Sequence, residues 1–284
     1  MGNVRIVTDS TADIPAELRE KLGISMVPLK VLFGEETYVD AVTITAEQFY
    51  EKLKGVPTLP TTSQPSPLEF SEMYERLLGE DPEAPIISIH LAACLSGTYQ
   101  SATIAQSMLE QEADITVVDS RSASYGIGTL VVRAAEMALA GRGKEEILAE
   151  IQRLRNDITI YFLVDSLEHL HKGGRIGRAS ALIGSILNIK PILSLDVDGG
   201  VHAVDKVRGT KKAMARISEM LKESYGSDPV SLTIFKTDDE AAAQELGERV
   251  KADLNVQRVG YAAIGPVIGT HAGPGTSAVL IHRV

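Results

Sequence analysis

The chain has 284 residues, enough for two compact domains, and 44% of them are hydrophobic, as in an ordinary globular protein. The formal net charge of −10 disfavours general nucleic-acid binding, and no apolar run approaches the roughly 20 residues of a membrane span. The single cysteine, Cys94, cannot form an internal disulfide, and the chain does not open with a charged segment followed by an apolar one. We therefore expect a cytoplasmic protein of bacterial type, without a membrane span and without nucleic-acid binding.

Apolar runs and helical patterns alternate over the first 160 residues. Residues 4–8 predict a strand that ends at Asp9, and a helix is expected from Pro15, because proline favours the first helical turn. Thr45 and Gln48 form a capping-box pattern at the start of a further helix. We also expect strands at 25–33, 86–91 and 115–118, a loop at 55–67, and helices at 68–78, 98–110, 127–140 and 144–155.

The pattern changes after about residue 160, although no linker separates the two parts. Asp198-Gly199-Gly200 between two apolar runs predicts a β-hairpin. Helices are expected from Thr210 and Asp238, and strands at 158–164, 192–197, 201–204, 230–235 and 258–263. We predict an α/β protein with two domains. Residues 1–160 would form a mostly parallel sheet with flanking helices, and residues 161–284 an α/β domain with a mixed sheet.

The stretch from Leu95 to Ala102 follows the apolar run 85–91 and precedes a helical pattern. Ser96 and Thr98 are therefore expected at a helix N-terminus, where free backbone N–H groups and the helix dipole attract an anion. In such a place, Ser96 could attack a ligand or could hold it by hydrogen bonds.

Two other polar loops could share a site with Ser96. The first is 61–66, which is rich in Thr and Ser, and the second is 269–276, which places His271 among glycines. Each loop taken alone is explained by turns and helix caps. Taken together, the loops offer hydroxyls, backbone N–H groups and one imidazole, which suit a carboxylate held in a sheltered place.

The same residues could form an acyl hydrolase or acyltransferase that uses Ser96 and His271. Asp9 or Asp40 would then orient the histidine. Against this alternative, Ser96 lacks the Gly-x-Ser-x-Gly elbow, because neither position two residues away is glycine. For Asp9 we favour a structural role, in which its carboxylate holds loops by hydrogen bonds.

Six short motifs occur in order along nearly the whole chain: Thr8–Asp13, Thr62–Ser66, Ser96–Ala102, Lys172–Arg175, Lys206–Gly209 and His271–Thr276. They resemble those of the DegV family of bacterial fatty-acid-binding proteins. The resemblance implies a two-domain fold in which a long-chain acyl tail is buried in a tunnel of the second domain. Apolar residues between Ile176 and Ile189 could line the tunnel, although an amphipathic helix packed on a sheet explains the same pattern.

By this resemblance, Thr62, Ser96 and His271 hold the fatty-acid carboxyl at the junction of the two domains. Further contacts are expected from Thr61, Gly97, Thr98 and Gly273. The chain would then be a non-catalytic lipid-binding subunit without metal or cofactor. Its partner would be the ATP-binding subunit of a fatty-acid kinase, which makes acyl phosphate for phospholipid synthesis.

Residues 169–216 carry nine Lys or Arg against three Asp, a net charge of +6. A solvated helix face explains this pattern, and so does a docking surface for an acidic or phosphate-carrying partner. The resemblance implies the second interpretation, with Arg175 and Arg208 directed toward the kinase. A carrier for another small carboxylic acid is a third hypothesis, which ligand length would separate from a fatty-acid carrier.

Overall fold

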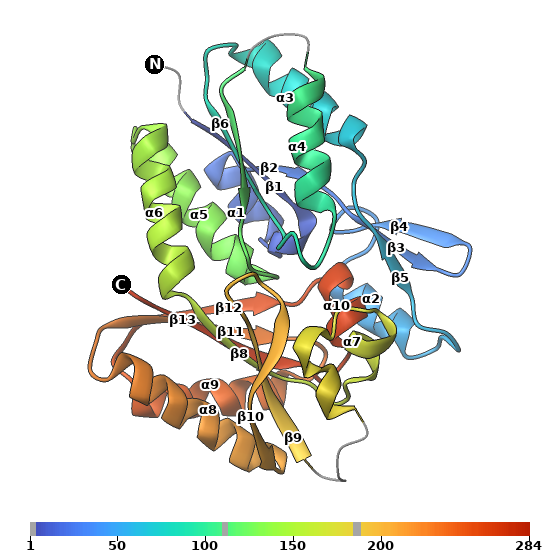
Figure 1. The fold of residues 1–284 in the computed structure, drawn as a ribbon, viewed down its shortest axis with the longest axis vertical. Helices are drawn as coiled ribbons and strands as arrows, with labels where there is room; N and C mark the ends of the chain where they lie inside the picture. Colours follow the sequence, from blue (N-terminus) through green and yellow to red (C-terminus); the bar gives the residue numbers. More distant parts are fainter. Residues whose placement is uncertain (1–3, 110–112, 184–188) are drawn as a thin grey trace. The chain divides into compact units, whose positions relative to one another are not determined.

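The computed structural model describes residues 4–109, 113–183 and 189–284, and Figure 1 shows their elements in chain order. These residues form two compact units. The first contains the chain up to Ile44 together with Pro60–Asn156, and the second contains Thr45–Leu59 together with Asp157–Val284. The short segment Thr45–Leu59 thus belongs with the C-terminal part of the chain. As independently folding domains, the continuous ranges 1–160 and 161–284 stay a prediction.

The first unit is built on a four-stranded parallel sheet with the order β2-β1-β6-β7. The central strand β6 is buried at every position, as expected where helices cover both faces of a parallel sheet. Figure 1 shows α3 beside α4 in this unit. The elements are β1 (Arg5–Asp9), η1 (Ser10–Ala12), α1 (Ala16–Leu22), β2 (Ser25–Val27), α3 (Pro67–Glu80), β6 (Ile86–His90), α4 (Thr98–Met108), β7 (Ile115–Asp119), α5 (Tyr125–Leu139) and α6 (Lys144–Asp157).

A small antiparallel sheet with the order β4-β3-β5 completes the first unit. Its strands are β3 (Lys30–Phe33), β4 (Glu36–Val39) and β5 (Thr61–Ser63). The prediction of one strand over 25–33 is wrong, because Pro28 has no N–H to donate and the chain changes sheets there. The predicted loop over 55–67 is wrong in part, since it contains β5. This strand is polar throughout, so the apolar alternation that signals a strand is missing.

The second unit is built on a six-stranded mixed sheet with the order β10-β9-β8-β13-β11-β12. The β9–β10 hairpin predicted around Asp198-Gly199-Gly200 is confirmed, and Oδ1 of Asp196 closes its turn by accepting the Gly200 N–H at 2.9 Å. The elements are α2 (Ala46–Leu53), β8 (Thr159–Leu163), α7 (Glu168–Lys172), η2 (Gly177–Leu182), β9 (Ile189–Leu195), β10 (Val201–Arg208), α8 (Thr210–Tyr225), β11 (Val230–Lys236), α9 (Glu240–Asp253), β12 (Val256–Ala263), α10 (Pro266–Ala272) and β13 (Ser277–Arg283).

Besides the short helices α7 and η2, the sequence-based prediction for this unit lacks β13 and α10. The strand β13 lies between β8 and β11, so a segment close to the C-terminus forms an inner strand of the sheet. The helix α10 starts at Pro266, and its Gly and Thr content resembles that of a loop. By contrast, the capping box predicted at Thr45 and Gln48 is confirmed at the start of α2.

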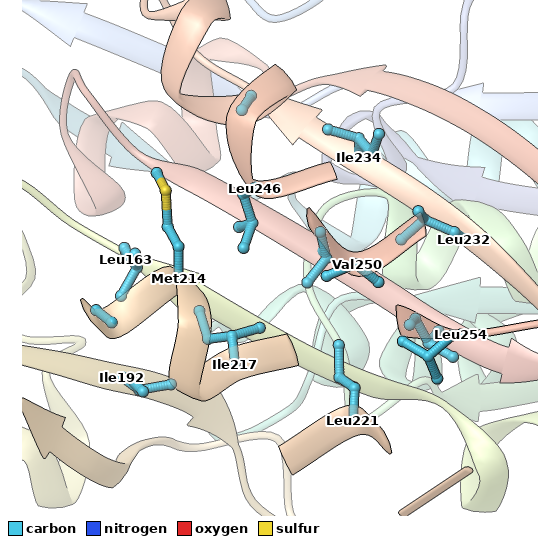
Figure 2. Packing of buried hydrophobic residues seen from close by; sticks show 14 of the residues in the cluster. Leu163, Ile192, Met214, Ile217, Leu221, Leu232, Ile234, Leu246, Val250 and Leu254 are labelled. Atoms are coloured by element: carbon cyan, nitrogen blue, oxygen red, sulfur yellow. The ribbon is translucent and has the colours of Figure 1, made fainter. Parts of the chain in front are cut away.

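The main core of the second unit is apolar. Helices α8 and α9 lie side by side along the sheet (Figure 1), and Figure 2 shows their apolar side chains packed against those of the strands. Met214, Ile217 and Leu221 recur at the helical spacing that places them on one face of α8. Leu246 and Val250 of α9 are fully buried in the same cluster. Each such side chain contributes about 1.5–3 kcal/mol of hydrophobic stabilisation.

The predicted fold class is confirmed: the chain is α/β, with a parallel sheet in one unit and a mixed sheet in the other. Among the residues that the structure describes, no helix combines the length and the apolarity that a bilayer crossing needs.

Candidate functional site

The carboxyl ends of β1 and β6 are neighbours in the parallel sheet. The chain pairs β2 on the outer side of β1 and β7 on the outer side of β6, so the strand order reverses between these two strands. In open α/β sheets, such a switch point forms a crevice in which ligands bind. The loops that follow Asp9 and His90 therefore frame the candidate site of the first unit, and the second of them carries Ser96.

Asp9 ends β1 and is fully buried. Its Oδ1 accepts the N–H of Thr11 at 3.0 Å and also the hydroxyl of that residue. Its Oδ2 accepts the N–H of Leu91 at 3.1 Å and lies 3.0 Å from Nδ1 of His90. Burying a carboxylate is costly unless it has such partners. Asp9 therefore anchors the first residue of the loop that leads to Ser96, and its predicted loop-holding role is confirmed.

The hydrogen bonds continue from His90 into the core. Nε2 of His90 lies 2.7 Å from Oγ of Ser88, which accepts the hydroxyl of Tyr74 at 2.9 Å. The hydrogen bonds connect an acid, a histidine and a serine (Asp9, His90 and Ser88) in the order of a hydrolase triad. All three residues are 0% exposed, so no substrate reaches Ser88. Asp9 is thus engaged with His90. Polar residues inside the otherwise apolar run of β6 are the sequence signal that could have revealed this network.

The loop between β6 and α4 is also held by the neighbouring β7–α5 connection. Ala92 donates its N–H to the carbonyl of Ser122 at 3.0 Å, and Ala93 donates to Oδ1 of Asp119 at 3.3 Å. Three successive N–H groups after β6 are therefore fixed by acceptors from elsewhere in the unit. Such directional bonds define the path of the chain toward Ser96.

Ser96 lies just before α4, as predicted. Its hydroxyl is half-buried, lies 2.9 Å from the hydroxyl of Thr98 and accepts the Thr98 N–H at 3.3 Å. Gly97 is the N-cap residue and has no side chain to satisfy the free N–H groups of the first turn. The Ser96 and Thr98 hydroxyls thus stand together at the positive end of the helix dipole.

The strand β5 is tied to the same helix. Gln64, just after β5, donates from Nε2 to Oγ of Ser101 on α4 at 3.2 Å. Its side-chain amide also packs so closely on Gly97 that a Cβ at that position would overlap it. Glycine is therefore required at position 97 for this contact. The segment of Thr61 and Thr62 and the Ser96 loop, two of the three polar segments singled out in the sequence, are linked through Gln64.

The third polar segment belongs to the second unit. His271 lies in the last turn of α10, so the prediction of a loop over 269–276 is wrong for its first half. The helix ends at Gly273, whose φ of 83° is a left-handed conformation that favours glycine. The glycines of this motif therefore mark the end of a helix and the loop that follows it.

Helix α7 contacts the His271 end of α10. Nδ1 of His169 lies 3.1 Å from the carbonyl of Thr270, and Gly173 approaches the His271 ring so closely that a Cβ would overlap Nδ1. Arg175 follows this turn, and its Nη1 donates to the Gly173 carbonyl at 2.7 Å. The motif that contains Arg175 therefore lies beside the motif that contains His271, which the sequence did not indicate.

Burial, followed by the nearby side chains of Arg175 and His169, lowers the pKa of His271 to about 4. The imidazole is therefore neutral at pH 7. A neutral imidazole donates from one ring nitrogen and accepts at the other. It can bind either a carboxylate or a carboxylic acid without supplying a full charge.

Much of the positive charge in residues 169–216 is compensated locally. Arg178 pairs with Asp196, and Arg216 pairs with Asp205 and with two glutamates of its own helix. Lys172 pairs with Glu168, and Lys190 pairs with Asp165. Four further cations lie around the end of β10 and the start of α8. Among the described residues, no ion pair is formed by Lys206, Arg208, Lys211 or Lys212.

The segment expected to line an acyl tunnel lies partly outside the described residues, which omit 184–188. Of its other members, Ile176 is buried and Ile183 is 46% exposed. Within the described part of the chain, no group of three His, Cys, Asp or Glu side chains could hold a metal ion.

Comparisons with known proteins bear on this site. The family model described as "Uncharacterised protein, DegV family" matches residues 3–283. A DegV domain-containing protein of Halalkalibacterium halodurans is 39% identical over 277 residues, 97% of each chain. The structure of a fatty-acid-binding DegV family protein from Thermus thermophilus has a TM-score of 0.92 at 38% identity over 100% of both chains. The structure of DegV from Bacillus subtilis, a fatty acid binding protein, has a TM-score of 0.87 at 36% identity over 100% of both chains.

The matches extend over 97% or more of these proteins and confirm the resemblance that the six motifs indicated. The chain therefore belongs to the DegV family.

Proposed function

We propose that this chain binds a long-chain fatty acid and holds the carboxyl group with Thr62, Ser96 and His271. The acyl tail would occupy a tunnel in the second domain. Neighbouring residues supply further contacts to the carboxyl: Thr61, Gly97, Thr98 and Gly273. The protein itself performs no chemistry on the ligand and uses no metal or cofactor.

The observation that carries this proposal is the neutral, hydrogen-bonding character of the three polar segments. Ser96 and Thr98 offer hydroxyls at a helix N-terminus, and His271 offers an uncharged imidazole because burial lowers its pKa. Hydrogen bonds to a charged group contribute about 1.5–3 kcal/mol each. A few such bonds are enough to orient a carboxylate, while burial of the tail provides most of the affinity.

The relatives support the same ligand class. The DegV family structures from Thermus thermophilus and Bacillus subtilis are those of fatty-acid-binding proteins, and both cover the whole chain. A carboxyl group that another protein modifies has to be held and not attacked. Hydroxyl donors such as those of Thr62 and Ser96 serve that purpose.

We further propose that the ligand is presented to the ATP-binding subunit of a fatty-acid kinase, which Arg175 and Arg208 help to dock. The support is electrostatic: the cations at the end of β10 and the start of α8 have no acidic partner among the described residues. Such a group attracts an acidic or phosphate-carrying surface and accelerates its association.

The first experiment extracts lipid from the purified native protein and identifies it by mass spectrometry. We expect a long-chain fatty acid, and we expect Ser96→Ala to weaken binding about tenfold, the effect of losing one good hydrogen bond. Thr103→Val is the matched control, because Thr103 lies on α4, is exposed and bonds only its own helix. An empty protein that also fails to take up long-chain fatty acids contradicts the proposal, and uptake of only short carboxylic acids supports the third hypothesis instead.

The second experiment measures phosphoryl transfer to bound fatty acid by a bacterial fatty-acid kinase. Arg208→Glu should leave lipid binding intact and reduce transfer at least tenfold, whereas Lys222→Glu, at the far end of α8, should change neither. Arg175→Glu is the critical variant, because Arg175 lies beside His271. If it empties the protein of lipid, Arg175 belongs to the ligand site and not to the docking surface.

The hydrolase alternative makes a separate prediction. A nucleophilic Ser96 would be labelled by a fluorophosphonate, and ester hydrolysis would require His271. We expect no label and no turnover in a protein that retains its lipid.

A further inference from the structure

A groove of about 450 Å³ lies at the carboxyl end of β7, outside the residues proposed to bind the carboxyl group. Tyr99 from the first turn of α4 and Asp119 at the end of β7 contribute to its lining. Arg121 lines it from the following loop and Arg155 from α6. Its volume is within the usual range for small-molecule sites. We refer to it as the Arg121–Arg155 groove.

The charges that line the groove are unbalanced. Asp119 is its one acidic residue among those described, and Oδ1 of that carboxylate already accepts the N–H groups of Arg121 at 2.9 Å and Ala93 at 3.3 Å. The exposed Arg121 guanidinium has no ion pair among the described residues. Two cations therefore face the groove against one carboxylate that is engaged with the backbone.

The guanidinium group of Arg155 is held in place by hydrogen bonds to neighbouring residues. Its Nη1 donates to the carbonyl of Asp119 at 2.8 Å, and its Nη2 donates to the Gln152 side chain. Its buried Nε has no acceptor within the described part of the chain. Burial, followed by the nearby charge of Arg121, lowers the pKa of Arg155. The positive charges of Arg121 and Arg155 repel each other, and an anion bound by both offsets that repulsion.

The backbone at Arg121 is strained. Its φ of 52° is in the left-handed region, which costs a non-glycine residue about 1–2 kcal/mol. The hydrogen bond from its N–H to Oδ1 of Asp119 holds this conformation. Strain that is maintained in this way is typical of residues positioned for a ligand.

We propose that the Arg121–Arg155 groove binds the phosphate group of a small organic phosphate. Guanidinium groups match the geometry of phosphate oxygens and bind them with charge-assisted hydrogen bonds. The rest of the lining is suited to an organic substituent, since it contains the ring of Tyr99 and the apolar side chains Val117, Val118, Leu148 and Ile151. The proposal stands independently of fatty-acid binding, because it includes none of the residues proposed for the carboxyl site.

Calorimetric titration of the full-length protein with phenyl phosphate, inorganic phosphate and benzoate tests the proposal. Phenyl phosphate should bind with a Kd of about 1 mM or lower and at least threefold more tightly than inorganic phosphate, because only the former has a ring to bury. Benzoate, which carries the same ring and a smaller charge, should bind at least tenfold more weakly than phenyl phosphate. If phenyl phosphate shows no binding up to about 10 mM, or if benzoate equals it, the proposal is wrong.

Variants locate the binding. Arg121→Gln and Arg155→Gln should each weaken phenyl phosphate about tenfold, as expected for one charge-assisted contact. Arg142→Gln is the matched control, because Arg142 is exposed and pairs with Glu146 at the other end of α6. Ser96→Ala should also leave phenyl phosphate binding unchanged. If Arg155→Gln fails to fold, Arg121→Gln decides alone, since Arg121 is exposed and makes no ion pair among the described residues. If Arg142→Gln and Arg121→Gln lose the same affinity for phenyl phosphate, the attraction comes from the overall charge of the protein, and the proposed site is wrong.

Discussion

The two units hold their candidate side chains by different physical means. In the first, the loop that carries Ser96 begins on a network of buried ionisable residues, in which Asp9 and His90 are 0% exposed and bonded to each other. In the second, His271 in the last turn of α10 packs against the end of α7, and the main core is apolar (Figure 2). Among the described residues, every Asp or His side chain that is at most 1% exposed belongs to the first unit.

This difference determines which substitutions should affect each unit, and whether they change its stability, its ligand binding or both. Hydrogen bonds are directional, and a buried partner left without its bond carries the full desolvation penalty. Apolar packing is less directional, so the loss of one side chain weakens the core but does not redirect a loop. Substitutions in the first network should therefore change both stability and ligand binding, and substitutions in the second core should change stability alone.

The largest effect is expected for Asp9→Ala. The change leaves His90 and the N–H groups of Thr11 and Leu91 without their buried acceptor, so the free energy of unfolding should fall by about 4 kcal/mol. Urea unfolding measures it. Thr8→Val is the control, because it removes one buried hydrogen bond between the same two strands, to the Ile89 carbonyl, and should cost about 1 kcal/mol. Equal losses of unfolding free energy in the two variants would mean that the Asp9 network contributes no more than one ordinary buried hydrogen bond.

Leu246→Ala should lower the free energy of unfolding by about 3 kcal/mol, since the side chain is fully buried between α9 and the sheet. At 25 °C the variant should still bind fatty acid with unchanged affinity. Titration with a fluorescent fatty acid checks this. An affinity loss as large as that of Ser96→Ala would remove the distinction between the two units.

The two units should also respond to pH in opposite directions. Burial, together with the charge of Asp9, raises the pKa of Asp40 to about 6, while burial lowers the pKa of His271 to about 4. Between about pH 4 and 6, folded Asp40 binds more protons than the unfolded chain does, so its contribution to stability falls as pH rises. Folded His271 binds fewer protons there, so its contribution rises with pH.

Two variants separate these contributions. Asp40→Asn should make the protein more stable than wild type at pH 7, by about 2 kcal/mol, and the advantage should vanish near pH 4. His271→Asn should remove the opposite slope, so that its stability relative to wild type falls as pH rises from about 4 to 6.5. Urea midpoints at several pH values measure both. Parallel curves for Asp40→Asn and wild type would show that Asp40 does not titrate in this range.

The smallest effect is expected for Gly97→Ala. The added methyl group displaces Gln64, which links β5 to α4, so fatty-acid affinity should fall about tenfold while stability changes by less than about 1 kcal/mol. Gly79→Ala is the control, because Gly79 lies on α3 with nothing within 4 Å of an added Cβ. An unchanged affinity in Gly97→Ala would mean that Gln64 does not help to position the site.

Long segments with a clear period were predictable from the sequence, and short polar ones were not. The helices α3 and α8 and the strand β6 follow their apolar patterns closely. The strand β5 is polar at each position and exists because Thr62 pairs with Val31 of β3. The helix α10 is rich in Gly and Thr and is supported by tertiary contacts, such as the close approach of Gly269 to the Tyr50 ring.

The same limit applies to the candidate site. The position of Ser96 at a helix N-terminus was predictable, because it depends on a local pattern of strand, turn and helix. The partner of Asp9 was not, because His90 is 81 residues away in the chain. The proximity of Arg175 to His271 likewise depends on how α7 packs against α10. Such contacts are tertiary, and no local propensity encodes them.

The assignment of Thr45–Leu59 to the second unit has a consequence for the order of folding during synthesis. The helix α2 leaves the ribosome early, but the hydroxyl of Tyr50 donates to the carbonyl of Ile264, which is made 214 residues later. Until then, the 0% exposed ring of Phe49 has no partner from the later chain. A fragment that stops at Asn156 would display the otherwise buried rings of Phe49 and Tyr50 on this helix, so an expressible first unit should replace residues 45–59 with a short polar linker.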